Sequence, residues 1–141
     1  MSKLVYVTRK ERFNAAHKLW HQEWSDQKNF DTFGKCSNPN WHGHNYDLFV
    51  TIKGVPDPIT GFCMDLKFLS QLINDKVIDQ LDHKNLNLDV PFLAGIKSST
   101  ENVAIAIWEQ LETEINATGC QLHCIKLYET ENNFVEYYGG K

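Results

Sequence analysis

Residues 43–54 read Gly-His-Asn-Tyr-Asp-Leu-Phe-Val-Thr-Ile-Lys-Gly, and this stretch predicts the central strand of the fold. Side chains at every second position of a strand share one face of the sheet. Here those positions hold His44, Tyr46, Leu48, Val50 and Ile52. The alternation predicts a strand.

Another strand is expected over residues 4–16, before the predicted central strand in the sequence. This segment alternates in part and carries β-branched residues. Between the two strands, residues 18–41 are polar and rich in Trp, Asn, Asp and Gln. Long loops in compact domains are usually functional or disordered, so this excursion is a candidate functional loop. Downstream of the central strand, residues 56–61 form a turn that contains two prolines.

Two helices are expected in the middle of the chain. Asp65 is placed to cap the first helix, and apolar residues continue at helical spacing to Leu81. Residues 82–97 form an irregular segment. Ser98 and Glu101 fit a capping box that opens the second helix, with Ser98 as the cap. An apolar stripe then runs to Ile115.

The C-terminal segment reads as a hairpin, with strands over residues 121–130 and 134–139 around a turn at residues 131–133. The order β, β, α, α, β, β predicts an α+β fold with a four-stranded antiparallel sheet and two helices on one face. No repeat or linker interrupts the chain, so one domain is expected over residues 1–141. Leu127, Val135 and Tyr137 suggest more apolar strand surface than one helix layer covers, which favours an oligomer.

Composition limits the classes of function. The chain has 141 residues with a net charge of −4, which argues against nucleic-acid binding. No stretch is long and apolar enough to span a bilayer, and the N-terminal residues lack the apolar region of a signal peptide. The four cysteines form no CxxC pair, so reduced thiols and a cytoplasmic location are expected.

The first chemical constellation is a group of histidines. His42 and His44 are two residues apart, so on a strand both imidazoles point to one face, and Gly43 between them permits close approach. Catalytic zinc sites use three protein ligands and keep one position open. His17, at the end of the first strand, is the best third ligand, and His21 is the second candidate.

Cys36 lies six positions before His42, beside Lys35 and among turn residues. A nearby cation lowers the pKa of a thiol, so this setting predicts a reactive cysteine. The other cysteines, Cys63, Cys120 and Cys124, stand in apolar strand-like patterns and are expected to be buried hydrophobic residues.

Two further positions carry candidate chemistry. Asp82 and His83, at the end of the first helix, are typical of a pair in which a carboxylate tunes an imidazole that transfers protons. Glu129 ends an apolar strand, where a carboxylate can bind a ligand rich in N–H groups. The alternatives are a histidine that complements the dipole at a helix end and a solvated charge at a strand end.

These pieces together resemble the 6-pyruvoyl-tetrahydropterin synthase family. The resemblance covers nearly the whole chain and rests on short motifs in the same order. They are Phe13–His17, Gly34–Cys36, His42–Tyr46, Leu81–Leu86, Ser99–Ala104 and Tyr128–Thr130. One departure is Trp41, which stands where a small residue is more usual and puts the local loop shape in doubt.

The resemblance implies a tunnelling fold, in which the sheets of three subunits form a twelve-stranded barrel and two trimers stack into a homohexamer. It implies Zn²⁺ on His17, His42 and His44. It also implies a pterin triphosphate substrate, 7,8-dihydroneopterin triphosphate, which loses triphosphate to give 6-pyruvoyl-tetrahydropterin on the route to tetrahydrobiopterin.

The family pattern also implies roles for other residues. Cys36 matches the base, and Asp82 and His83 match the pair that assists it from a neighbouring subunit. Glu129 matches the catalytic-site carboxylate that anchors the pterin ring. Thr100 and Glu101 match residues that line the pterin pocket. No basic residue is assigned to the triphosphate, for which the candidates are Arg9, Arg12, Lys18 and Lys35.

Four alternatives remain open. A related branch, the 6-carboxy-tetrahydropterin synthases of deazaguanine synthesis, resembles the chain in the same ligands, but its cysteine usually lies closer to the histidine pair. Two features favour the biopterin branch: the motif Gly-Lys-Cys-Ser-Asn-Pro-Asn at residues 34–40, and the five residues between Cys36 and His42. A third branch, which cleaves the side chain elsewhere, lacks this cysteine. A non-catalytic zinc- or pterin-binding module would need neither Cys36 nor the Asp82–His83 pair, and a structural zinc site would require a fourth protein ligand.

Overall fold

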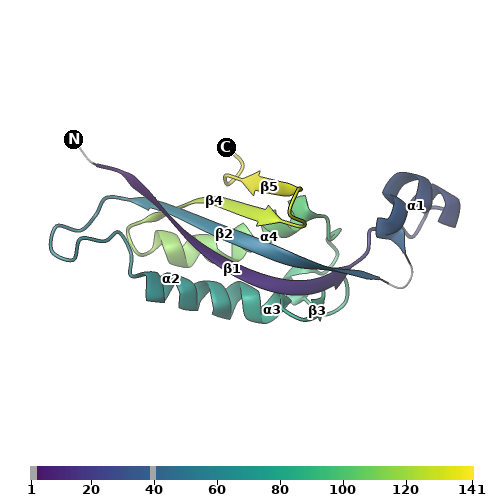
Figure 1. The fold of residues 1–141 in the computed structure, drawn as a ribbon, viewed down its shortest axis with the longest axis horizontal. Coiled ribbons are helices and arrows are strands. Elements are labelled where there is room, and N and C mark those ends of the chain that lie inside the picture. Colours follow the sequence, from purple (N-terminus) through teal and green to yellow (C-terminus); the bar gives the residue numbers. More distant parts are fainter. Residues whose placement is uncertain (1–2, 39–40) are drawn as a thin grey trace.

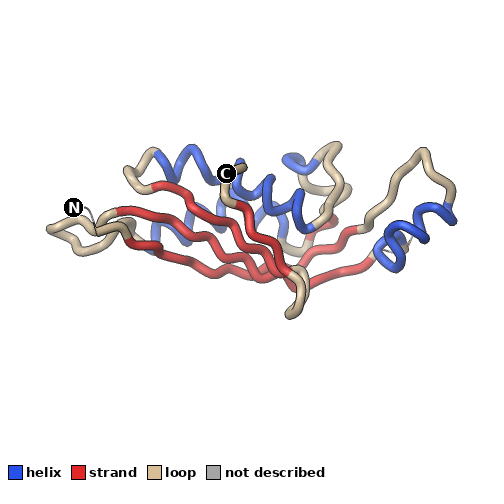
Figure 2. The backbone as a smooth tube through the Cα atoms, turned by 90° about the horizontal axis from the view of Figure 1, so that it is seen from above, coloured by secondary structure: helices blue, strands red, loops and turns tan. Residues whose placement is uncertain are grey.

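A computed structural model describes residues 3–38 and 41–141, and it shows a twisted sheet with helices along one face (Figures 1 and 2). Pro39 and Asn40, which belong to the predicted cysteine motif, lie outside the described residues. The four main strands are antiparallel neighbours, as predicted. They are β1 (Val5–His17), β2 (His42–Gly54), β4 (Gln121–Tyr128) and β5 (Phe134–Tyr137).

β1 and β2 form a long ribbon that positions the histidines. Their register runs without a shift from Val5 opposite Gly54 to His17 opposite His42. The two strands extend beyond β4 and β5 toward the helix α1 (Asp26–Phe33) (Figure 1). Because the pairing is continuous, the end of β1 and the start of β2 meet at the same point.

The sheet has a fifth strand, β3 (Lys84–Asn85), in the segment that we expected to be irregular. It is parallel to β1 and gives the order β3-β1-β2-β4-β5. A two-residue strand has too little periodicity to be recognised in a sequence, and its pairing depends on tertiary contact with the edge of β1. The 3₁₀ helix Pro91–Leu93 lies in the same segment.

The first predicted helix is confirmed, with Asp65 as its cap: the Asp65 carboxylate accepts a hydrogen bond from the Lys67 N–H. This helix consists of α2 (Leu66–Ile73), a π-helical turn (Asn74–Ile78) and α3 (Asp79–Leu81). Its apolar stripe packs against β1.

The second predicted helix is α4 (Thr100–Asn116), and the expected capping box at Ser98 is wrong. Ser99 caps this helix instead, accepting a hydrogen bond from the Asn102 N–H. Ser98 is completely buried, and its hydroxyl donates to Asn87 Oδ1. Since both serines can cap a helix, the choice was made by the tertiary partners of Ser98.

The polar segment of residues 18–41 contains structure that the sequence did not predict. α1 is capped by Ser25, whose side chain accepts a hydrogen bond from the Lys28 N–H. A 3₁₀ helix, Gly34–Ser37, follows and carries Cys36. Helix α1 has few apolar residues, and its buried residue is Asn29. The sequence therefore has no apolar stripe from which this helix could be predicted.

The core lies between α2, α4 and one face of the sheet (Figure 2). The interpretation of Leu127, Val135 and Tyr137 as uncovered surface is wrong, because all three lie on the covered side. Leu127 is fully buried, and Val135 and Tyr137 pack on the core, with the Tyr137 ring 5.5 Å from that of Trp108. The opposite face carries mixed polar and aromatic side chains. Among the described residues, no helix has the length and apolar character needed to cross a membrane.

Candidate metal centre

Three imidazoles converge at the end of the β1–β2 ribbon. His17 is the last residue of β1 and pairs with His42, the first residue of β2, while His44 follows two positions later on the same face. The ring centroids of the three histidines lie 4.4, 4.8 and 5.0 Å apart. Strand register therefore brings together residues 25 or more positions apart in the sequence.

His17 is held in one orientation and one tautomer. Its side chain is 1% exposed, and Nδ1 lies 2.8 Å from the carbonyl oxygen of Ser98. A carbonyl only accepts, so Nδ1 carries the proton and the lone pair of Nε2 faces the other rings. Burial lowers the pKa of His17, which favours the neutral, ligating form of the ring.

The pKa of His42 is lowered in the same way as that of His17. Burial, followed by the neighbouring His17 and His44, lowers its pKa. Its two ring nitrogens and Nε2 of His17 are buried without a hydrogen-bond partner among the described residues. Buried polar atoms are rarely left unpaired, because the loss of hydration is costly. Neutral imidazole nitrogens directed at one another fit a metal cation, which would satisfy them together.

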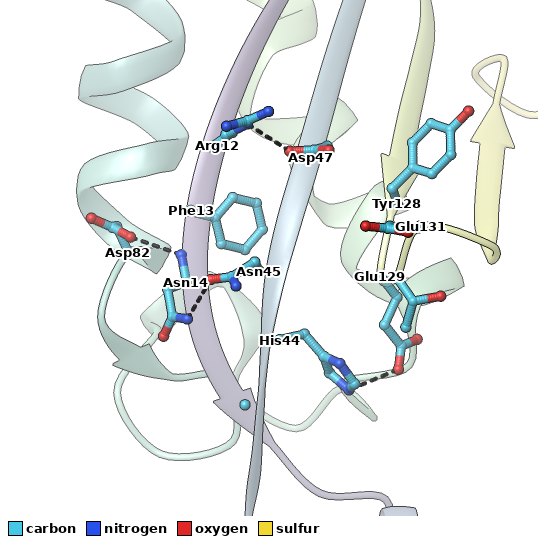
Figure 3. A pocket seen from close by; sticks show the side chains of 12 residues that line it. Arg12, Phe13, Asn14, His44, Asn45, Asp47, Asp82, Tyr128, Glu129 and Glu131 are labelled. Atoms are coloured by element: carbon cyan, nitrogen blue, oxygen red, sulfur yellow. Dashed lines mark hydrogen bonds and ion pairs between the residues drawn. The ribbon is translucent and has the colours of Figure 1, made fainter.

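Glu129 completes this cluster from β4, directly after that strand ends. Its Oε1 lies 3.0 Å from His44 Nε2 and 3.8 Å from His17 Nε2 (Figure 3). One ligand atom from each of the three histidines and from Glu129 lies within 4.8 Å of every other. Three nitrogens and a carboxylate suit a divalent transition metal. We call these four residues the metal cluster.

The cluster corrects our expectation of Glu129 in one respect. The sequence predicted a ligand-binding carboxylate at a strand end, and the structure places it among the histidines as well. The Thr100 hydroxyl donates a hydrogen bond to Glu129 Oε2, and the Glu129 N–H donates to the Asn133 carbonyl. Sequence alone could not reveal the proximity to His44, because it depends on the pairing of β2 with β4.

Cys36 lies beside the metal cluster but is not a member of it. Its carbonyl accepts a hydrogen bond from the Leu19 N–H at 2.7 Å, which ties the 3₁₀ helix to the end of β1. Burial, and then the negative charge of Glu129, raise the pKa of the Cys36 thiol. The chain alone thus does not provide the lowered pKa that we expected from Lys35. A cation at the cluster would act in the opposite direction.

Asp82 lies on the outer edge of β1, on the side away from Glu129 (Figure 3), and His83 follows it, with its N–H donating to the Asn14 carbonyl of β1. Asp82 Oδ1 accepts a hydrogen bond from the Asn14 N–H at 2.8 Å, and this bond is the main cause of the lowered pKa of Asp82. Asp82 Oδ2 lies 2.9 Å from His83 Nδ1, so the predicted pair is formed. The His83 side chain is 81% exposed, and the backbone of His83 has a positive φ of 60°. Within one chain, His83 does not join the metal cluster.

A cavity of about 660 Å³ connects these regions (Figure 3). His44, Glu129 and Asp82 are among its lining residues, and Arg12, paired with Asp47 at 3.0 Å, reaches its wall. This volume suits a ligand the size of a small heterocycle with a side chain.

The remaining predicted residues fall outside the metal cluster. Glu101 is exposed in the first turn of α4, and the ring of His21 packs edge-on against Trp24. Lys18 and Lys35 line a second cavity of about 610 Å³, next to α1. The ammonium of Lys18 lies 5.0 Å from the ring of Trp20 and 4.9 Å from that of Trp41, which has a positive φ of 63°. Arg9 pairs with Glu11 at 3.0 Å.

The fold and site define a class, α+β proteins with a histidine-rich metal centre at the end of an antiparallel sheet. Comparison with known proteins narrows it. The family described as 6-pyruvoyl tetrahydropterin synthase matches residues 6–140. The chain is 47% identical to the 6-pyruvoyl tetrahydrobiopterin synthase of Pongo abelii over 133 residues, which cover 94% of this chain and 90% of that protein. It is 45% identical to the protein of the same name from Dictyostelium discoideum, with 99% of each covered.

A solved structure agrees with these sequence matches. The 6-pyruvoyl tetrahydropterin synthase of Caenorhabditis elegans superposes with a TM-score of 0.90 at 38% identity, covering 99% of this chain and 98% of that one. The chain belongs to the 6-pyruvoyl tetrahydropterin synthase family and has its tunnelling fold. The predicted family and fold class are confirmed.

Proposed function

We propose that the chain is a carbon–oxygen lyase that converts 7,8-dihydroneopterin triphosphate to 6-pyruvoyl-tetrahydropterin and inorganic triphosphate, a step toward tetrahydrobiopterin. The observation that carries this proposal is the metal cluster, two of whose members, His44 and Glu129, line a ligand-sized cavity. The relatives compared above, which match nearly the full chain, are all named as 6-pyruvoyl tetrahydropterin or tetrahydrobiopterin synthases, and this supports the proposed reaction.

The metal is Zn²⁺ in this proposal, with His17, His42 and His44 as its ligands. Burial lowers the pKa of His17 and His42, and ring nitrogens of both are buried without a hydrogen-bond partner among the described residues, which suits the neutral, ligating form that zinc binding requires. When bound, the ion would supply Lewis-acid polarisation of the substrate's side-chain oxygens.

Cys36 acts as the general base. It is near enough to Glu129 for that charge to raise the pKa of its thiol, and it lies outside the ligand set, so with a metal ion bound its thiolate would be available to accept a proton from a side-chain carbon of the substrate. The electron pair of the broken C–H bond forms a C=C bond, and the adjacent C–O bond breaks so that its electron pair leaves with the triphosphate. Two electrons move from the side chain to the ring by tautomerisation, so no external oxidant or reductant is needed.

Glu129 binds the pterin ring through the 2-amino and ring N–H groups. A carboxylate accepts two such parallel hydrogen bonds. The Thr100 hydroxyl holds one oxygen of Glu129, which sets the direction of the carboxylate. Glu101 contributes at the rim of the pocket through main-chain groups, since its side chain is exposed.

Asp82 and His83 assist Cys36 from a neighbouring subunit of a homohexamer. The exposure of His83 and its place on the outer edge of β1 support this arrangement, because a side chain on that edge can reach another copy of the chain. The sheet ends on β5 and on β3, which pairs with only two residues of β1, and these edges together with the mixed aromatic face of the sheet support a closed barrel of three sheets.

The proposal also covers the chain as a whole. One domain over residues 1–141 agrees with a family match that extends from residue 6 to residue 140 and with a single sheet that involves both ends of the chain. A cytoplasmic location is part of the proposal and is supported by the free thiols of all four cysteines.

Incubation with dihydroneopterin triphosphate, followed by identification of the pterin product, tests the function. Zinc-loaded protein should release 6-pyruvoyl-tetrahydropterin and triphosphate, and chelator-treated protein should release neither. Recovery of the 6-carboxy product with acetaldehyde would assign the chain to the other branch. Zinc binding without turnover would indicate a non-catalytic module, and His44→Ala serves as the control that should lose both.

A further inference from the structure

The metal cluster depends on an anchor that none of its ligands provides. His17 receives its orientation from the Ser98 carbonyl, which belongs to the irregular segment before α4. A carbonyl in such a segment can hold an imidazole only if the segment is itself fixed. The hydrogen bonds around Ser98 and Lys18 show what fixes it.

Asn87 extends the sheet with its side chain. The Lys18 N–H donates to Asn87 Oδ1 at 3.0 Å, and Asn87 Nδ2 donates to the Lys18 carbonyl at 3.0 Å. This pair of bonds imitates a neighbouring strand. It continues the main-chain contacts in which the His83 N–H donates to the Asn14 carbonyl and the Leu86 N–H to the Ala16 carbonyl. β1 is therefore held on its outer edge on both sides of His17.

The same amide also holds Ser98. The Ser98 hydroxyl donates to Asn87 Oδ1 at 3.0 Å and lies 3.4 Å from the Lys18 carbonyl. Asn87 Oδ1 thus accepts from two segments at once, the end of β1 and the residue whose carbonyl binds His17 Nδ1. Ser98 is completely buried, whereas Asn87 is exposed, so the Asn87 amide is the group that bonds the buried Ser98 hydroxyl from the solvent side.

We propose that Asn87 is a positioning residue for the metal centre: it locks the Ser98 carbonyl onto His17 Nδ1 and so fixes the tautomer that presents Nε2 to the ion. The inference rests on the proposed metal site. Loss of an outer partner of a metal-bound histidine typically weakens metal affinity about 10- to 100-fold. Asn87 acts one contact further out, so Asn87→Ala should weaken zinc affinity by about tenfold, the low end of that range.

Competition with a chromophoric chelator measures the zinc Kd of each variant. Asn87→Asp keeps the acceptor for Lys18 and Ser98 but turns a carboxylate oxygen toward the Lys18 carbonyl in place of the donor, so it should recover only part of the affinity. Asn116→Ala is the matched control. The Asn116 side chain also ties a helix to a strand, accepting from the Leu122 N–H at 2.9 Å, but it does so at the other end of α4. It should leave the zinc Kd unchanged.

A second variant, at Ser98, removes the other partner of the hydrogen bond between Ser98 and Asn87. Ser98→Ala removes the hydroxyl but keeps the carbonyl, and its effect on zinc affinity should be less than additive with that of Asn87→Ala, because both break one bond. In the metal-free protein, ¹H–¹⁵N correlation of the His17 ring should show the Nδ1–H tautomer weakened by Asn87→Ala.

The outcomes separate this inference from the function it rests on. If wild-type protein binds no zinc, or His44→Ala binds it equally well, the metal site itself is refuted. If wild type binds zinc and His44→Ala does not, an unchanged Kd and tautomer in Asn87→Ala would refute the role of Asn87. An equal loss of affinity in Asn116→Ala would reduce the effect of Asn87 to general stability.

Discussion

The covered face of the β1–β2 ribbon has two regions that share a backbone pairing and differ in chemistry. The apolar middle, represented by Leu48, Val50 and Ile52, is fully buried under the helices. The histidine end, His17, His42 and His44, continues the same face and register. In the middle, apolar contacts satisfy the side chains completely. At the histidine end, ring nitrogens are buried without partners among the described residues.

This contrast shows how one strand pattern serves both stability and chemistry. Burial of apolar groups stabilises the middle, at about 25 cal/mol per Å² of apolar surface. The unpartnered nitrogens cost free energy in the chain alone, and binding of an ion would recover it. Local rules of polar satisfaction are expected to fail at functional sites, and among the described residues the unpaired buried atoms are ring nitrogens of the three histidines and the hydroxyl of the neighbouring core residue Tyr46.

The largest effect should come from Cys36→Ala, which separates proton transfer from metal binding at the histidine end. Loss of a general base lowers turnover by about 10²- to 10⁴-fold. Product formation from dihydroneopterin triphosphate gives the rate, and zinc content should remain that of wild type. Turnover near the wild-type rate would exclude Cys36 as the base.

The apolar middle should determine stability without affecting the metal. Ile52→Ala removes fully buried atoms and should lower the unfolding free energy by about 2–5 kcal/mol. Urea denaturation of the metal-free protein measures this change, and the zinc Kd should be that of wild type. A large loss of zinc affinity in a folded variant would show that the two regions are not independent.

Metal removal should affect the histidine end alone. Zinc at 100 times its Kd should stabilise the folded chain by about 2.7 kcal/mol over the chelator-treated protein, because the unfolded chain lacks the assembled site. Calorimetry with and without the chelator measures the difference. The His44→Ala variant should show no stabilisation, and the full effect in that variant would place the metal elsewhere.

A smaller effect on catalysis is expected at the contact between α4 and the metal cluster. Thr100→Val keeps the shape of the side chain and removes the donor to Glu129. Loss of such a hydrogen bond costs about 1 kcal/mol, which should raise KM for the pterin about fivefold. Thr100→Ser, which keeps a hydroxyl, should bring KM back toward the wild-type value. An unchanged KM in Thr100→Val would mean that Glu129 needs no orienting partner.

The smallest effect concerns pH. The folded-state pKa of Asp82 is lowered by the Asn14 N–H, so its contribution to stability is present above the unfolded value of about 3.9 and is lost as pH falls through the folded pKa. Wild type should exceed Asp82→Ala by a few tenths of a kcal/mol at neutral pH, since solvent screens this site, and by nothing in acid. Glu112→Ala, on the exposed surface of α4, is the control and should show no such dependence.

Sequence reasoning succeeded where one residue pattern has one physical outcome. The alternation along residues 43–54 predicted β2, and Asp65 predicted the start of α2. It failed where two neighbours are chemically equivalent. Ser98 and Ser99 can each cap a helix, and only the burial of Ser98 against Asn87 decides between them.

The sheet faces show a second limit. Leu127, Val135 and Tyr137 were predicted to need an oligomer for cover, but α4 packs over their strands. The face to which a strand turns its apolar residues follows from alternation, whereas the position of a helix over that face does not. The prediction of an oligomer stands on the family resemblance and on the free strand edges, and it remains to be tested.

The sequence by itself determined which residue types the site contains: a histidine pair two positions apart, a third histidine at a strand end, a nearby cysteine and a carboxylate after an apolar strand. Those features depend only on local spacing. The tertiary structure alone decided that Glu129 meets His44, that Ser98 holds His17, and that the exposed His83 lies outside the metal cluster of its own chain. These contacts join residues far apart in the sequence, so they depend on strand pairing and helix packing that no local pattern contains.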